Sequence, residues 1–255
     1  MIVFTSDFGS RDWYVGAVKA VLAERAPRVP VLDLCHGVPP GAIGSAAFVL
    51  TVNLGLFPPD TVQLVVVDPG VGSTRRALAL RAHGQFWVGP DNGVFAPFLA
   101  EKDLSAVELD VEKLAVENPS STFHGRDIFA VAAARLATGD KLSALGNPIQ
   151  ELKGGEPWWR RTPDAILARV LWVDTFGNLI TGVPSEVLRE FAPTPQVRLA
   201  NRTLTGLRDS FHEVARGECL LYIGSSGTLE LAARDASAAE AVGIQVGAEI
   251  EIRSA

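Results

Sequence analysis

A carboxylate and an arginine flank a glycine-rich turn at the end of a predicted buried strand. Residues 65–67 are all valine, Asp68 follows them, and the turn PGVGST separates it from Arg75. Such a turn is typical of a phosphate cradle, because free backbone N–H groups and a nearby cation bind the anion. Asp68 at the head of the turn would repel phosphate. The pattern therefore indicates chemistry in which a carboxylate and an arginine face each other.

Further polar residues stand beside predicted strands and helices. Asp7 follows the first apolar run, where a carboxylate can accept hydrogen bonds from both hydroxyls of a ribose. Asp12 has two interpretations, a functional contact or the N-cap of the next helix. His124 precedes another predicted helix, and a single histidine is more often a cap or packing residue than a catalyst. We expect only such structural roles for the remaining histidines, His36, His83 and His212.

The first half of the chain alternates predicted strands with predicted helices. Continuous apolar runs predict buried strands, and apolar residues at helical spacing predict the helices between them. This alternation favours a parallel sheet covered on both faces, in which ligands bind at the carboxyl ends of the strands, just where Asp7 and Asp68 lie. Strands are expected at 2–5, 29–34 and 62–67, a hairpin at 77–82 and 85–89, and helices at about 12–27, 39–58 and 125–136.

The composition changes at KGGEPWWRRTP, residues 153–163, which has the glycine, proline, charge and tryptophan content of a linker or an interface loop. We expect its Trp158 and Trp159 to lie near a buried contact rather than fully exposed. Short β-like runs follow, so we predict an α/β domain over 1–152, a linker over 153–163 and a smaller β-rich domain over 164–255. The runs are 166–173, 178–183, 197–200, 219–224, 228–233 and 248–253, with helices near 185–191 and 235–241.

The composition excludes several classes of function. A net charge of -6 without any basic run argues against nucleic-acid binding. No segment reaches the roughly 18 continuous apolar residues of a membrane helix, and the first residues lack the basic region of a targeting signal. We therefore expect a cytoplasmic protein. The two cysteines, Cys35 and Cys219, have no partners at zinc-binding spacing, so we expect no metal site.

Seven segments together carry more information than any one of them. They span nearly the whole chain in the order TSDFG, LCHGVPP (34–40), VDPGVGSTRR (67–76), GPDNGVF (89–95), STFHGRDIFA (121–130), DTFGNLITG (174–182) and SSGTLELA (225–232). The series resembles the S-adenosyl-L-methionine hydroxide adenosyltransferase family, which is related to the fluorinase and chlorinase enzymes. The resemblance implies an N-terminal α/β domain, a β-barrel-like C-terminal domain, and a homotrimer with each site between two subunits.

The implied reaction converts S-adenosylmethionine and water into adenosine and methionine. In the family's motifs an aspartate, an arginine and a histidine surround the attacking water, and they fall on Asp68, Arg75 and His124. The sulfonium of the substrate is already an excellent leaving group, so the reaction needs neither a metal nor a cofactor. It needs a water molecule aimed at C5′, which these three groups can orient and deprotonate.

The resemblance also implies a set of substrate contacts. Asp7 matches the ribose-binding aspartate, and Asp12 matches an acid that faces the amino-acid portion. Asp174 and Asn178 match contacts to the methionine amine and the adenine edge. The remaining implied contacts are the apolar walls Phe8 and Phe176, and Ser225 with its neighbour Ser226 near the methionine carboxylate.

Three positions depart from the halogenating relatives. Ser226 stands where those enzymes have an arginine, and Gly41 where they have a tryptophan, which leaves the carboxylate contact and part of the sugar wall open. Asp68 stands where the fluorinase has a tyrosine. A carboxylate at the nucleophile site repels an anion, so this change argues against halide as the nucleophile.

Two other functions fit the same segments. One is a SAM-dependent halogenase, which Asp68, Arg75 and His124 disfavour. The other is a non-catalytic sensor that binds adenosine or S-adenosylmethionine in the same pocket, since hydrolysis of so costly a metabolite is wasteful. Incubation with excess enzyme separates them, because a sensor returns its ligand intact.

Overall fold

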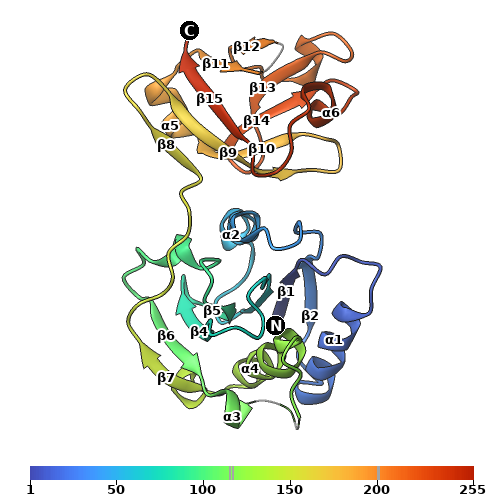
Figure 1. Ribbon diagram of the computed structural model, residues 1–255, viewed down its shortest axis with the longest axis vertical. Coiled ribbons are helices and arrows are strands. Elements are labelled where there is room, and N and C mark those ends of the chain that lie inside the picture. The colour runs from blue at the N-terminus through green and yellow to red at the C-terminus, as the bar shows by residue number, and fades with distance from the viewer. Residues whose placement is uncertain (115, 117, 200–201) are drawn as a thin grey trace. The chain divides into compact units, whose positions relative to one another are not determined.

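The computed structural model describes residues 1–114, 116, 118–199 and 202–255. The chain divides into two compact units, Met1–Glu156 and Pro157–Ala255 (Figure 1). Among the described residues, no helix is both long and apolar enough to span a membrane.

The first unit is built on a seven-stranded mixed sheet in the order β2-β1-β3-β5-β4-β6-β7. The neighbours β2, β1, β3 and β5 run parallel, whereas β4, β6 and β7 are antiparallel to the strands beside them. The predicted parallel strands and the predicted β4–β5 hairpin are therefore confirmed. The strands are β1 Ile2–Ser6, β2 Val31–Cys35, β3 Val62–Val66, β4 Ala77–Ala82, β5 Gln85–Pro90, β6 Ser105–Leu109 and β7 Gly146–Ile149.

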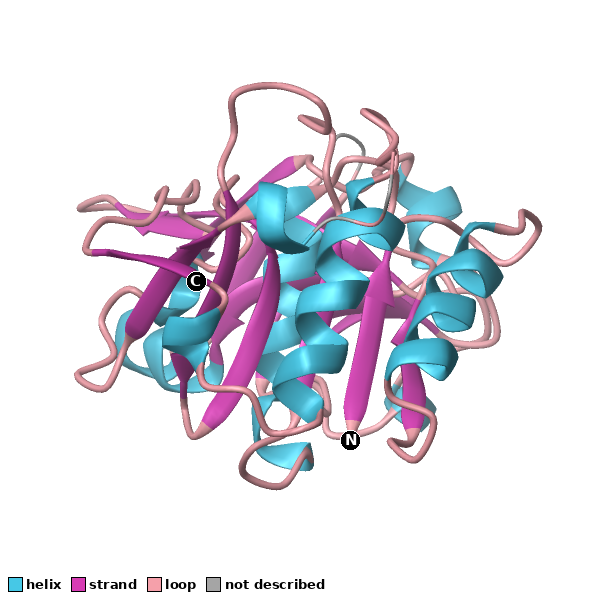
Figure 2. Cartoon of the chain, turned by 90° about the horizontal axis from the view of Figure 1, so that it is seen from below, coloured by secondary structure: helices cyan, strands magenta, loops and turns pink. Residues whose placement is uncertain are grey.

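Helices cross one face of this sheet (Figure 2). Helix α1 (Tyr14–Arg25) contributes the buried Val18 and Leu22, which share one apolar core with Ile2 and Phe4 of β1. Helix α4 (Ala130–Ala137) adds alanines to the same core. Burial of these side chains fixes the helices against the sheet, because each Val, Leu, Ile or Phe side chain removed from water contributes roughly 1.5–3 kcal/mol.

The helices differ from the sequence expectation at their ends. Trp13 occupies the N-cap of α1 and no side chain caps the helix, so the capping interpretation of Asp12 is wrong. The helix expected from residue 125 begins as a π-helical turn, Gly125–Phe129, before α4 continues it. The remaining helices of the first unit are α2 Ile43–Val52, α3 Val111–Leu114 and the 3₁₀ turns Leu54–Leu56, Ala96–Phe98 and Leu142–Ala144.

The second unit is a barrel-like antiparallel sheet in the order β12-β11-β15-β9-β10-β14-β13, with β8 paired to β9. A bridge between Leu207 and Leu221 brings the two ends of the sheet toward each other. The predicted β-barrel-like domain is therefore confirmed. The strands are β8 Trp159–Arg161, β9 Ile166–Val173, β10 Leu179–Pro184, β11 Pro195–Arg198, β12 Thr203–Thr205, β13 Cys219–Ile223, β14 Thr228–Ala233 and β15 Glu249–Ser254.

Short helices cover this barrel, namely α5 (Ser185–Phe191), α6 (Ala238–Val242) and the 3₁₀ turn Phe211–Glu213. The run expected at 197–200 corresponds to β11, and its last residue, 200, lies outside the described residues. Trp158 and Trp159 are half-buried, and Trp159 packs against the core of the second unit. Trp159 therefore makes a buried contact within its own unit.

A buried carboxylate anchors the end of the first unit. Asp91 is 7% exposed and accepts hydrogen bonds from Arg76 Nε at 2.8 Å and from the backbone N–H of Lys153 at 2.8 Å. Arg76 also donates to the carbonyl oxygen of Glu151 at 2.7 Å. These bonds tie residues 151–153 to β4 and β5.

We expect Asp91→Ala to lower the free energy of unfolding by about 2–4 kcal/mol, because Arg76 and the Lys153 N–H lose their acceptor in a largely buried place. The matched control is Glu190→Ala, which removes an ion pair with Arg161 in which the glutamate side chain is 73% exposed. That change should cost less than about 1 kcal/mol. Chemical denaturation followed by fluorescence measures both, and equal losses would contradict the anchoring role.

Candidate active site

Two predicted site residues follow neighbouring parallel strands. Asp7 comes directly after β1, and Asp68 comes two residues after the end of β3. Because the strands are parallel, both carboxylates lie at the same edge of the sheet. Burial raises the pKa of Asp7, and the nearby charge of Asp68 raises it further, while a hydrogen bond from the Gly41 N–H at 2.8 Å acts in the opposite direction. The two acids are therefore electrostatically coupled.

Arg75 joins Asp68 to His124. Its Nε lies 3.0 and 2.9 Å from the two carboxylate oxygens of Asp68, and its Nη2 forms an ion pair with the same group. The same Nη2 lies 2.8 Å from His124 Nδ1. The side chains of Arg75 and Asp68 are only 9% and 5% exposed. The structure thus brings together the three residues that the sequence singled out for chemistry.

The protonation of His124 follows from its partner. An arginine nitrogen only donates hydrogen bonds, so Nδ1 of His124 must accept and the imidazole proton must sit on Nε2. Burial lowers the pKa of His124, and the positive charge of Arg75 lowers it further, against a smaller opposing effect of Asp68. His124 is therefore a neutral imidazole that presents an N–H donor from Nε2.

A close approach between the π-helical turn and β3 holds His124 in place. A Cβ atom on Gly125 would lie 2.8 Å from Val66 Cγ1, so only glycine allows the turn to approach the strand this closely. Arg75 also lies over the ring of Phe129 in the same turn, 5.1 Å from its centroid. The segment HGRDIF therefore supplies both the imidazole and the surface on which the arginine rests.

Aromatic rings line the segment next to Asp7. Phe8 lies 5.5 Å from Tyr14 and 5.9 Å from Phe123, measured between ring centroids. Phe8 was predicted as an apolar wall, whereas Tyr14 and Phe123 were not singled out for the site. Tyr14 lies at the apolar spacing of a helix, which looks like ordinary core packing. Phe123 lies inside the STFHGRDIFA segment, where an aromatic residue by itself does not indicate a contact. Asp12 is exposed in the loop that leads into α1.

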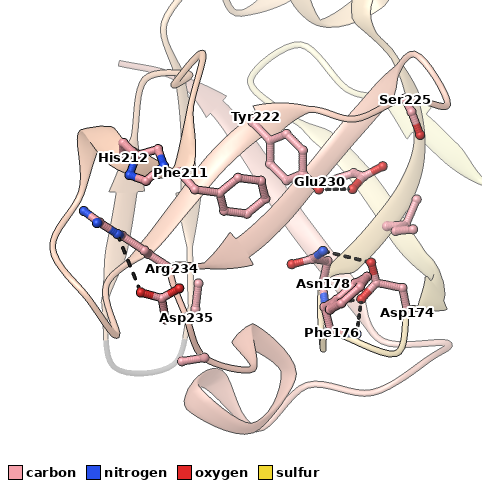
Figure 3. Close-up of a pocket in the computed structure, with 13 residues that line it drawn as sticks. Asp174, Phe176, Asn178, Phe211, His212, Tyr222, Ser225, Glu230, Arg234 and Asp235 are labelled. Carbon is pink, nitrogen blue, oxygen red and sulfur yellow. Dashed lines mark hydrogen bonds and ion pairs between the residues drawn. The ribbon is translucent and has the colours of Figure 1, made fainter.

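The second unit contains a pocket of about 790 Å³ (Figure 3). Four predicted residues line it, Asp174, Phe176, Asn178 and Ser225, while Ser226 lies beside it. Residues that sequence reasoning did not place in a site also line it, among them His212, for which only a structural role was expected. These additional residues are Ile180, Phe211, His212, Tyr222, Glu230, Ala233, Arg234, Asp235 and Ala236.

Asp174 shapes the turn between β9 and β10. Its Oδ1 accepts from the backbone N–H groups of Phe176 at 2.9 Å and Asn178 at 2.8 Å, and its Oδ2 accepts from Asn178 Nδ2 at 2.8 Å. The Asn178 amide oxygen keeps its capacity to accept further bonds. Phe176 stands at the tip of the turn with 78% of its surface exposed. The turn therefore presents a polar amide and an aromatic ring together.

The other histidines behave as the sequence predicted in two cases. His36 Nδ1 lies 2.7 Å from Ser6 Oγ, and its Nε2 lies 3.2 Å from Asp33, so this ring braces β1 against β2. His83 pairs with Glu101 at 3.3 Å. No group of three or more His, Cys, Asp or Glu side chains among the described residues is arranged to hold a metal ion.

Comparison with known proteins agrees with these features. Residues 2–146 match the N-terminal domain of the SAM hydroxide adenosyltransferase family, and residues 168–251 match its C-terminal domain. Proteins named (R)-S-adenosyl-L-methionine hydrolase are similar over nearly their whole lengths. The one from Thermus thermophilus is 40% identical, covering 98% of both chains, and the one from Salinispora tropica is 37% identical, covering 98% of this chain and 97% of its own.

More distant similarity extends to a fluorinase of Nocardia brasiliensis, 26% identical over 99% of this chain and 96% of its own length. The crystal structure of a conserved protein from Thermotoga maritima superposes with a TM-score of 0.90 at 34% identity, covering 99% of this chain and 100% of that one. Both domain matches, in order, and these full-length relatives lead to one conclusion. The chain belongs to the SAM hydroxide adenosyltransferase family.

Proposed function

We propose that the protein hydrolyses S-adenosyl-L-methionine to adenosine and L-methionine through attack of water at C5′. The observation that carries the proposal is the Asp68–Arg75–His124 cluster at the carboxyl edge of the parallel strands. The names of the similar hydrolases specify the R configuration at the sulfonium sulfur, and we extend that preference to this chain.

The cluster has the donors and acceptors that an attacking water needs. His124 Nε2–H donates to the water oxygen, and Asp68 accepts one of its protons, which leaves an oxygen lone pair free to reach C5′. The C5′–O bond forms as the C5′–S bond breaks, and the bonding electrons return to sulfur as the neutral thioether of methionine. The second water proton stays on the new hydroxyl of adenosine. Arg75 is the positioning residue, because its guanidinium donates hydrogen bonds to both partners.

A sulfonium leaves without protonation or a Lewis acid, so the proposed reaction needs no cofactor. Halide fits the cluster poorly, since the Asp68 carboxylate would face the incoming anion at a largely buried position. This contrast favours water over halide although fluorinases are relatives.

The substrate is proposed to contact both units. Asp7, whose carboxylate is oriented by the Gly41 N–H, accepts the ribose hydroxyls, and Phe8 provides an apolar wall beside it. Asn178 and the Phe176 ring face the adenine, and Ser225 donates to the methionine carboxylate. We propose that Asp174 acts on the amino group and also orients Asn178. Asp12, exposed in its loop, is proposed to face the amino-acid portion.

We further propose that the protein is a cytoplasmic homotrimer whose sites lie between subunits. Asp68 and His124 belong to the first unit, and Asn178 and Ser225 belong to the second, so each unit supplies half of the proposed contacts. A trimer that pairs the halves of different chains would complete three equivalent sites. The charged, soluble nature of the substrate supports the cytoplasmic location.

The reaction itself is tested with the two sulfonium epimers supplied separately to excess enzyme. We expect stoichiometric adenosine and methionine, faster from the R epimer, unchanged by chelator, and no halogenated nucleoside when fluoride or chloride is added. Liquid chromatography with mass detection identifies the products. Recovery of intact ligand after prolonged incubation would instead identify a sensor.

Substitution at the cluster should affect turnover far more than substrate binding. Asp68→Asn keeps the size but removes the proton acceptor, so we expect kcat to fall by about 10²–10⁴ with a small change in substrate Kd. Arg75→Ala and His124→Ala should act in the same direction. The double variant Asp68→Asn with His124→Ala should cost much less than the product of the single effects, since both act on one water.

The control for this series is the melting temperature of each variant. If the Asp68–Arg75 pair only braced the loop, stability and substrate affinity would fall together and kcat would survive. Unchanged turnover in Asp68→Asn would end the catalytic proposal.

Shared sites predict complementation between two inactive variants. Asp68→Asn damages the first unit and Asn178→Ala damages the second. In randomly mixed trimers, each intact first unit meets an intact second unit of its neighbour half the time, so a 1:1 mixture should recover about a quarter of wild-type activity at low substrate concentration. Activity no higher than that of the separate variants, or a monomer by light scattering at micromolar concentration, would contradict sites shared in a trimer.

A further inference from the structure

A buried carboxylate in the second unit has no role in the proposed reaction. Leu229 and Leu231 of β14 point into the core, and Glu230 between them points toward the pocket (Figure 3). Glu230 is only 5% exposed. No lysine or arginine among the described residues forms an ion pair with it. A buried charge without a partner is costly, so its position requires an explanation.

The carboxylate is held in one orientation. Tyr222 donates its hydroxyl to Oε2, and Ser226 Oγ lies 3.4 Å from Oε1. A Cβ on residue 224 would lie 1.8 Å from Oε1, so the carboxylate rests against the backbone of Gly224, and a larger residue there would have to displace it. A carboxylate has about four lone-pair directions, so two hydroxyl partners leave others free for a ligand.

The charges around Glu230 are suited to a cation. Burial raises its pKa, and the charge of Asp174 raises it further, while the Tyr222 and Ser226 hydroxyls act in the opposite direction. The arginine that lines the pocket, Arg234, is paired with Asp235 and lies on the other side of the pocket in Figure 3. Among the described residues, the side of the pocket that carries Glu230 and Asp174 is therefore acidic and has no lysine or arginine to neutralise it.

The proposed substrate carries two cations, the sulfonium and the α-ammonium group. A sulfonium has no hydrogen to donate, whereas an ammonium group has three N–H donors and needs oxygen acceptors at hydrogen-bond distance. Ser225, proposed to donate to the substrate carboxylate, lines the same pocket as Glu230. A donor and an acceptor in one pocket match an α-amino acid, which bears both charges on one carbon.

We infer that Glu230 is a specificity-determining residue that accepts the α-ammonium group of the amino-acid portion of the ligand. This inference rests on the proposed function. It also accounts for Ser226, because an arginine at that position would lie beside Glu230 and neutralise it. With serine there, residue 226 brings no cation to the carboxylate, and nucleosides without an amino-acid group gain nothing from it.

The test compares two thioether ligands that the proposed reaction does not cleave. S-adenosyl-L-homocysteine carries the α-ammonium group, and 5′-methylthioadenosine has the same nucleoside and sulfur without the amino acid. Glu230→Gln should weaken the first by about 10- to 100-fold, the typical effect of losing a hydrogen bond to a charged group, and the second by less than about threefold. Isothermal titration calorimetry measures both constants, and Glu249→Gln, an exposed carboxylate on β15, is the charge-matched control.

Each outcome has a distinct meaning. Equal weakening of both ligands would show a structural role, and no change in either would show an unused carboxylate, so both results overturn the inference. If the wild type binds neither ligand, the proposed function fails together with it. If Glu230→Gln does not fold, Tyr222→Phe decides, since loss of its hydroxyl should weaken only S-adenosyl-L-homocysteine, by a few-fold.

A third ligand separates recognition of the ammonium from recognition of the carboxylate. The decarboxylated thioether, 5′-(3-aminopropylthio)-5′-deoxyadenosine, keeps the amine alone. Glu230→Gln should weaken this ligand about as much as S-adenosyl-L-homocysteine. If the loss disappears with the ligand carboxylate, Glu230 acts as a neutral donor to that carboxylate, and the inference is wrong.

Discussion

The polar cluster of the first unit, Asp68, Arg75 and His124, depends on the hydrogen bonds that the Arg75 guanidinium donates. This guanidinium hydrogen-bonds to both Asp68 and His124, while its central carbon lies over the ring of Phe129. Because arginine only donates, this single group fixes which imidazole nitrogen carries the proton and how the carboxylate is turned. A lysine would offer one compact charge and could not impose both orientations at once.

The polar groups of the two units differ in their balance of charge. In the first unit the positive charge of Arg75 balances the negative charge of Asp68, so the cluster is nearly neutral before any ligand binds. In the second unit Asp174 accepts hydrogen bonds from its own turn, and the partners of Glu230 are the hydroxyls of Tyr222 and Ser226. The first arrangement suits the control of a small neutral molecule such as water, and the second suits capture of a positively charged one.

The sequence indicated the site where polar residues interrupt an apolar pattern. Asp7 and Asp68 each end a valine- or isoleucine-rich run, and the parallel order of β1 and β3 follows from those runs and the helices between them. The sequence did not indicate site residues that fit the regular alternation of a strand. Glu230 alternates with Leu229 and Leu231 as any outward-facing strand residue does, and only the fold shows that its outward face is a pocket. Strands β6 and β7 were missed for a related reason. Strand β6 pairs with β4, β7 pairs with β6 from a distant part of the chain, and β7 contains Pro148.

The spacing of the Arg75 cluster along the chain bears on how the molecule reaches its native state. Asp68 and Arg75 are 7 residues apart, whereas Arg75 and His124 are 49 apart. Closing the longer loop costs about 1.5–2 kcal/mol more conformational entropy in the unfolded chain. The ion pair can therefore assemble locally while the imidazole is still far away in a disordered chain. Docking of the π-helical turn onto β3 then completes the cluster. The complete cluster therefore forms only after these two distant segments of the first unit have packed together.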